Sequence, residues 1–323
     1  MGVFDKRVAL KPYEYPWAIE FKEKIQDSYW TFREMSFDSD VDDFKVKLTP
    51  VEREAVRRAM LAIGQVEVAV KEFWAKIGDR FPKPEFKQVG ITFGESEVRH
   101  ADAYTELLTV LGLNEDFDSL LSVPAIRGRV DYLSKHLSAG STPQQHTLAL
   151  TLFSLFVENV SLFVQFAVIK SVFKHRALLK NIDNVVQATQ LEEQLHALFG
   201  MRLVNAVRDE NPDWFNEGFY GAVEVACHKA YRAESAIVDW IYECGELPYL
   251  PKDTLTEFLK DRFNQSLEMI GGEALYEVDR TKLEGTRWFD EELLARINPD
   301  FFNKRPVTYS RFGEPITADD LFN

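Results

Sequence analysis

Two Glu-x-x-His motifs carry the strongest chemical signal in this sequence of 323 residues. They are Glu97-Val98-Arg99-His100 and Glu193-Gln194-Leu195-His196. Positions three apart share one face of an α-helix, so the carboxylate and the imidazole of each motif can bind the same metal ion. One such motif alone is weak evidence, because most pairs at this spacing are solvated surface charges.

Each motif has a further glutamate upstream in an apolar helical stretch, Glu67 before the first and Glu158 before the second. The same unit therefore occurs twice: a Glu on one helix and a Glu-x-x-His on the next. This ligand set is described for ferritin-like di-iron and dimanganese carboxylate proteins, which hold two metal ions in a helical bundle. The sequence thus predicts a dimetal site with the ligands Glu67, Glu97, His100, Glu158, Glu193 and His196.

The ligand chemistry favours Fe or Mn, because both accept mixed carboxylate and imidazole ligation. Four uncompensated carboxylates in a core would be costly, whereas two divalent ions would neutralise them. Glu224 and His228 form a contrasting pair, four apart, with no second unit to complete it. We expect that pair to be an ordinary surface feature.

Three residues near the ligands are candidates for supporting roles. Tyr104 follows His100 on the same helical face and can act as a one-electron donor, or simply be a core aromatic. Lys71 follows Glu67 and can hydrogen-bond a ligand from outside the site, or form an ordinary helix-surface pair. Glu192 can tie a ligand imidazole to its surroundings, or be a solvated charge.

The elements that must position these residues are helices. Thr49-Pro50-Val51-Glu52 offers an N-cap, a proline at the first helical position and a capping-box glutamate, and Thr142-Pro143-Gln144-Gln145 repeats this pattern. No segment shows sustained period-two alternation, so strands are at most minor. Helices are predicted at about 17–33, 50–78, 84–112, 124–137, 142–173, 177–208, 213–244 and 251–270.

We therefore predict an all-α fold: a ferritin-like helical bundle at 1–300 with a dimetal-carboxylate core, followed by a flexible C-terminal tail at 301–323. The apolar stretch at 148–173 is long enough to suggest a membrane span. Glu158 near its middle would be expensive in lipid, so we interpret the stretch as a buried bundle helix.

Composition narrows the function classes. The chain is 46% hydrophobic with a formal net charge of −14, which argues against nucleic-acid binding because no cationic surface would displace counterions. Two cysteines, Cys227 and Cys244, give no disulfide framework or thiolate metal site, and the N-terminus has no secretory h-region. These features predict a cytoplasmic location and no membrane association.

With these residues in place, the chain resembles the small, radical-generating subunit of class I ribonucleotide reductase over nearly its full length. The resemblance implies that Trp30 is a relay tryptophan, linked by Glu192 to the ligand His100. It also implies that Tyr309 is a mobile relay tyrosine and that 319–323 docks on the large subunit. Members of this family are usually homodimers.

Three departures from the well-known iron–tyrosyl-radical members point to manganese. The first ligand, commonly Asp there, is Glu67; Leu162 stands where some members have an aromatic residue; and Lys71 is added. This pattern is more similar to the subclasses that store the oxidising equivalent on manganese, including dimanganese forms. Mn₂ is therefore favoured, with Fe₂ and MnFe also compatible with these ligands.

The function predicted is generation of a one-electron oxidant that reaches the large catalytic subunit through Trp30 and Tyr309 and drives reduction of ribonucleotides to deoxyribonucleotides. No Gly-rich phosphate loop is evident, so this chain is expected to bind no nucleotide itself. The alternatives are a stand-alone dimetal oxidase or oxygenase acting on an apolar substrate, and a ferritin-like iron store.

Overall fold

The computed structural model describes residues 2–68, 70–137 and 140–302, with the backbone alone at 71, 135–137 and 296–302. No strand occurs within these ranges, and the all-α prediction is confirmed. The α-helices are α1 (Pro16–Asp27), α2 (Asp38–Asp42), α3 (Pro50–Glu67), α4 (Lys71–Ala75), α5 (Ile77–Arg80), α6 (Pro84–Leu111), α7 (Asn114–Asp118), α8 (Pro124–Leu137), α9 (Pro143–Leu152), α10 (Phe163–Arg176), α11 (Lys180–Glu210), α12 (Glu217–Ile241), α13 (Lys252–Glu268), α14 (Arg280–Leu283) and α15 (Arg287–Phe302).

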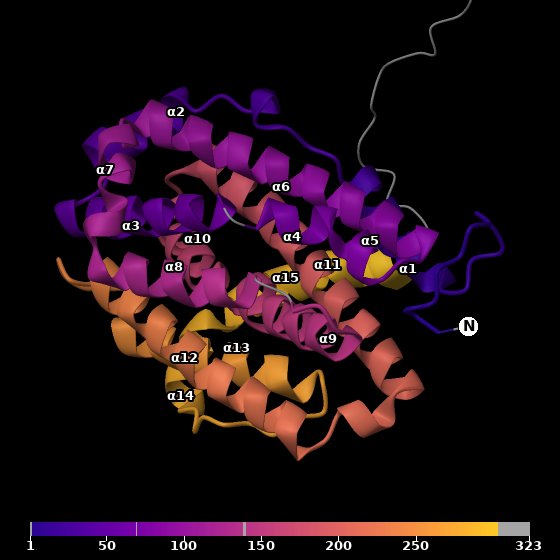
Figure 1. The fold of residues 1–323 in the computed structure, drawn as a ribbon. Coiled ribbons are helices and arrows are strands. Elements are labelled where there is room, and N and C mark those ends of the chain that lie inside the picture. Colours follow the sequence, from indigo (N-terminus) through magenta and orange to yellow (C-terminus); the bar gives the residue numbers. More distant parts are fainter. Residues whose placement is uncertain (1, 69, 138–139, 303–323) are drawn as a thin grey trace, which may run out of the picture.

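Short helical segments of other kinds connect them. Two are π-helices, η2 (Asp43–Lys47) and η4 (Phe153–Ser161). Four are 3₁₀ turns: η1 (Phe32–Glu34), η3 (Leu120–Ser122), η5 (Pro212–Trp214) and η6 (Glu284–Thr286). In Figure 1, α3 and α6 occupy the upper part of the bundle and α12 and α13 the lower part, with α10 and α11 between them.

Both predicted helix starts are present. The Thr49 hydroxyl accepts from the Glu52 N–H while Glu52 accepts from the Thr49 N–H, which is a complete capping box. Thr142 and Gln145 form the same arrangement at the start of α9. The first backbone N–H groups of a helix have no carbonyl partner within the helix, and a capping box satisfies two of them. The two boxes therefore mark where each ligand-bearing region begins.

The predicted helix at 50–78 is not continuous, because α3 ends at Glu67 and the chain resumes as the short helices α4 and α5. Local propensity does not explain the break, since the sequence after Glu67 contains good helix formers. Tertiary packing does: α4 lies against α6, and its Trp74 is completely buried beside the ligand Glu158.

The apolar region from Pro143 to Arg176 is one long helical run in which the π-helix η4 separates the α-helices α9 and α10. Its length and composition would allow a membrane span, but its apolar window is entirely buried inside the bundle. In η4 the backbone follows i→i+5 bonding instead of i→i+4, a rare conformation found mostly at functional sites. Glu158 lies within this segment.

A buried ion pair between Arg129 and Glu234 connects four elements of the bundle. Arg129 on α8 binds both carboxylate oxygens of Glu234 on α12, at 2.9 and 3.0 Å, and both residues are buried. The same guanidinium donates to the carbonyls of Ala62 on α3 and Ser161 at the end of η4. Arg129 therefore connects the helix that ends at Glu67 to the segment that carries Glu158.

Replacing Arg129 with methionine is expected to lower the free energy of unfolding by about 3–5 kcal/mol, because it leaves the Glu234 charge buried and unpaired. The double variant R129M/E234Q should lose less than the sum of the two single variants. Urea denaturation of the metal-free proteins measures both quantities. A loss below about 1 kcal/mol in R129M would contradict a structural role for the pair.

Candidate metal centre

The six predicted ligands come from four elements and are all buried. Glu67 is the last residue of α3, Glu97 and His100 lie on α6, Glu158 lies in η4, and Glu193 and His196 lie on α11. None is more than 2% exposed. The two repeated units of the sequence therefore converge in the interior of one bundle.

Their ligand atoms form two overlapping groups. Atoms of Glu97, Glu158, Glu193 and His196 lie within 4.8 Å of one another, and so do atoms of Glu67, His100 and Glu193. Glu193 belongs to both groups. A carboxylate shared between two such groups is the arrangement that two adjacent metal ions require.

The imidazole nitrogens face the carboxylates without making hydrogen bonds to them. His100 Nδ1 lies 2.9 Å from Glu193 Oε1, and His196 Nδ1 lies 3.1 Å from Glu97 Oε1. Neither approach has hydrogen-bond geometry. Nitrogen and oxygen atoms that lie close together without being directed at each other could bind a common cation.

The other nitrogen of each ring is held from outside the site. His100 Nε2 lies 2.8 Å from Glu192 Oε2, and His196 Nε2 lies 3.0 Å from Ser96 Oγ. Ser96 already donates its hydroxyl proton to the Phe93 carbonyl, so it must accept from His196. These contacts place a proton on each Nε2 and leave each Nδ1 available as a metal ligand.

The electrostatics of the site favour cations. Burial alone would lower the pKa of His100 and His196, but the surrounding glutamates outweigh it and raise both pKa values well above normal. Burial, reinforced by Glu193, raises the pKa of Glu158. Within the part of the chain that the structure describes, both oxygens of Glu97, with Glu158 Oε2 and Glu193 Oε1, have no hydrogen-bond partner. Two divalent ions fit this donor set, because they would supply the partners and the positive charge that it lacks.

A cavity of about 200 Å³ reaches one end of the site. Glu67 and Tyr104 line it, together with Gly64, Val68, Ala101, Thr105, Leu108, Asn114 and Phe117. Val68 is 63% exposed, so this wall of the cavity adjoins the protein surface. The Glu67 side of the centre is therefore less enclosed than the Glu158 side, which is packed within the core.

The ligand set and the bundle agree with the comparison of this sequence with protein families. The family described as ribonucleotide reductase, small chain, matches residues 7–283. This chain belongs to that family. All six ligands lie within the matched region, as do Trp30, Tyr104 and Glu192.

Relatives of the small chain support the same assignment. A protein of Invertebrate iridescent virus 3, named a probable ribonucleoside-diphosphate reductase small subunit, is 23% identical over 322 residues, covering 94% of this chain and 85% of the viral one. The ribonucleotide reductase R2 subunit from Clostridium botulinum has the same fold, with a TM-score of 0.77 at 16% identity, covering 87% and 89% of the two chains. The dimanganese(II)-NrdF of Streptococcus sanguinis has a TM-score of 0.74 at 16% identity, covering 87% and 99%.

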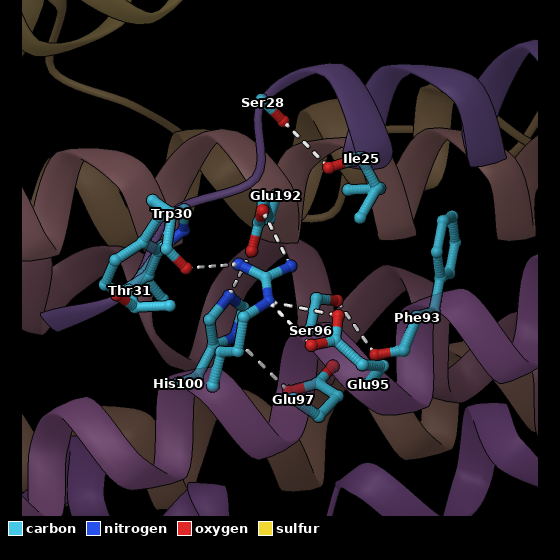
Figure 2. A network of polar contacts seen from close by, with 12 residues as sticks. Ile25, Ser28, Trp30, Thr31, Phe93, Glu95, Ser96, Glu97, His100 and Glu192 are labelled. Atoms are coloured by element: carbon cyan, nitrogen blue, oxygen red, sulfur yellow. Dashed lines mark hydrogen bonds and ion pairs between the residues drawn. The ribbon is translucent and has the colours of Figure 1, made fainter. Parts of the chain in front are cut away.

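The predicted helix at 17–33 is too long, because α1 ends at Asp27 and Trp30 follows it. The Trp30 side chain lies beside the ligand His100. The two rings are nearly parallel, with centroids 6.1 Å apart. Figure 2 shows Trp30, His100 and Glu192 gathered in one polar network. The indole N–H of Trp30 is buried and makes no hydrogen bond within the described residues.

Tyr104 projects from α6 into the cavity next to Glu67. It is 1% exposed, and burial, reinforced by the charge of Glu67, raises the pKa of its phenol. A raised pKa keeps the phenol protonated at neutral pH. The remaining predicted residues lie outside what the structure describes: the side chain of Lys71, and all of Tyr309 and 319–323.

Three residues that support the site were missed from sequence. The Trp74 indole donates to Glu158 Oε1 at 2.8 Å, and Ser96 holds His196 as described above. Arg99 binds Glu192 Oε1 at 3.1 Å and the Trp30 carbonyl at 3.2 Å. Ser96 and Arg99 each stand next to a ligand in the sequence, and this position is the one sequence signal for their supporting role. The role of Trp74 could be predicted only if the break after Glu67 were already known.

Replacing Trp74 with phenylalanine is expected to weaken metal binding by about tenfold, because Glu158 loses the N–H that orients it. The free energy of unfolding should also fall by about 2 kcal/mol, the usual cost of losing a hydrogen bond to a charged group. Metal titration and urea denaturation measure the two effects. Unchanged metal affinity would show that the Trp74 contact does not position Glu158.

Proposed function

We propose that this chain is the small subunit of a class I ribonucleoside-diphosphate reductase, and that it supplies the one-electron oxidant needed to reduce ribonucleotides to deoxyribonucleotides. One observation carries the proposal: the Trp30 ring lies nearly parallel to the ring of the ligand His100, with centroids 6.1 Å apart, so the paired ligand groups have a redox-active side chain beside them. Glu192 also connects His100 to Arg99, which donates to the Trp30 backbone carbonyl. A metal store would not need such a connection.

Glu67, Glu97, His100, Glu158, Glu193 and His196 would hold two divalent ions. Once bound and oxidised, the ions would supply a one-electron oxidant, which is chemistry that side chains alone perform poorly. We favour Mn₂, with Fe₂ or MnFe as the other candidates, because Glu67, Leu162 and Lys71 depart from the iron–tyrosyl-radical pattern. The bundle buries the ligands, and the cavity beside Tyr104 approaches them from the surface.

In this proposal Trp30 accepts the oxidising equivalent and Tyr309 passes it to the large catalytic subunit. Arg99 binds the Trp30 backbone carbonyl, and Glu192 connects Arg99 to His100. Tyr104 is the one-electron donor nearest the Glu67 side, and Lys71 supports that side from outside the ligand set. The C-terminal segment at 319–323 docks on the large subunit, so 301–323 serves as the tail of a bundle that ends near residue 300.

The assembly and location follow from the same proposal. We infer a cytoplasmic homodimer that binds a large subunit and neither nucleic acid nor membrane.

The rival function is a stand-alone dimetal oxidase or oxygenase, which needs the metal site but no tail. Deleting residues 309–323 separates the two. Under the proposal, the shortened chain binds metal normally but no longer supports ribonucleotide reduction by the large subunit. Ribonucleotide reduction at the full rate after the deletion would refute the docking role, and oxidation of an apolar substrate by the shortened chain alone would favour the oxidase.

A further inference from the structure

One buried arginine contacts the sequence neighbours of two metal ligands. Arg262 on α13 donates from Nε to the Asn159 carbonyl at 2.7 Å and from Nη2 to Asn159 Oδ1 at 2.8 Å. Its Nη2 also lies 3.4 Å from Gln194 Oε1. Asn159 follows the ligand Glu158 directly, and Gln194 follows the ligand Glu193.

The surroundings of Arg262 hold it in this position. Its side chain is 4% exposed and its guanidinium carbon lies 3.7 Å from the centre of the Phe163 ring. Nη1 reaches Asp290 Oδ1 at 3.4 Å. Burial lowers the pKa of Arg262 to about 10, which still leaves it a cation at neutral pH. A buried cation is tolerated only with such partners, so its contacts are not interchangeable with solvent.

A second side chain of α13 holds the same residue. Ser266, one helical turn beyond Arg262, accepts a hydrogen bond from Asn159 Nδ2 at 2.7 Å. Both polar ends of the Asn159 side chain and its backbone carbonyl are thus bound to α13. Because Asn159 lies in the π-helical segment η4, these bonds fix backbone that regular α-helical bonding does not.

The residues that follow the ligands of the first repeated unit are of another kind. The residues that follow Glu67 and Glu97 are Val68 and Val98, which are 63% and 47% exposed. Neither can hydrogen-bond through its side chain. The two repeated units of the sequence are therefore held differently: α13 binds the residues that follow the ligands of the second unit, whereas Glu192 and Arg99 hold His100 of the first.

We propose that Arg262 is a positioning residue for the metal centre, which fixes η4 against α11 so that Glu158 and Glu193 are held in binding geometry. The effect on metal affinity rests on the proposed function, whereas the effect on the order of η4 does not. Both effects can be measured separately.

The experiment compares R262M, R262K and the milder S266A with the unchanged chain and with N264A as a matched control. Asn264 lies on the same helix, is 6% exposed and makes three hydrogen bonds to Leu275 and Tyr276, away from the ligands. Hydrogen–deuterium exchange of the metal-free proteins reports on residues 153–161. Titration with Mn²⁺ alone gives the affinity of each folded variant.

R262M should increase amide exchange in residues 153–161 by about tenfold or more and weaken Mn²⁺ binding by about tenfold, as loss of support around ligands typically does. R262K and S266A should show smaller changes in the same direction. N264A should lower stability while leaving both readouts within about twofold of the original. Unchanged exchange in R262M and S266A, or equal changes in N264A, would overturn the inference. If the unchanged chain binds no Mn²⁺, the Mn₂ form of the proposed function fails, and the exchange data still decide the role of Arg262.

Discussion

Replacing Glu193 with glutamine is expected to weaken binding of the two ions by more than about 100-fold, since even residues that only support ligands cost 10–100-fold when changed. Glu193 is the one residue shared by both groups of ligand atoms, so its charge contributes to both ion positions. Glutamine keeps the size of the side chain but removes that charge. Ribonucleotide reduction should be lost with the metal.

The matched control for this variant is E224Q. Glu224 and His228 make an exposed pair at 3.7 Å on α12 and belong to neither group of ligand atoms found among the described residues. Metal stoichiometry of E224Q should equal that of the original chain, and circular dichroism should show that both variants are folded. Two tightly bound ions per chain in E193Q would contradict the assignment of the centre.

Replacing Trp30 with phenylalanine should lower ribonucleotide reduction by more than about 100-fold, equivalent to about 2.7 kcal/mol in barrier. Phenylalanine keeps most of the ring that lies against His100 but cannot be oxidised under the same conditions. Metal content should not change, because Trp30 is not one of the six ligands; it lies beside the His100 ring and, through its carbonyl, contacts Arg99. The measurement is deoxyribonucleotide formation with the cognate large subunit at equal metal loading.

Trp17 provides the control for the loss of an indole. It lies on α1 and packs against Phe86 and Phe199, with ring centroids 5.8 Å apart in both cases. W17F should be destabilised to a degree similar to W30F but keep its activity. Full activity in W30F, or equal loss in W17F, would remove Trp30 from the proposed path.

The doubled motif made the metal centre predictable because its information is local. On one helix, a Glu-x-x-His spacing places both groups on the same face, whatever the rest of the fold does. The two units also predict each other, since neither pair of glutamates can be buried without a partner charge. The capping boxes at Thr49 and Thr142 were predictable for the same reason: every bond in them spans three residues or fewer.

Features that depend on packing were not predictable. The break after Glu67 runs against local helix propensity, and the π-helical bonding around Glu158 has no sequence signal that we could identify. Trp74 and Arg262 reach the centre from positions far along the chain, 84 residues from Glu158 and 103 from Asn159. Such contacts exist only once the bundle has formed.

The measurement that tests the central claim most directly is ribonucleotide reduction by the metal-loaded chain together with its cognate large subunit. We predict that deoxyribonucleotide forms only when both proteins and the bound ions are present, and that metal removal from this chain abolishes it. The account would be contradicted if the fully metal-loaded pair formed no deoxyribonucleotide while this chain alone oxidised an apolar substrate.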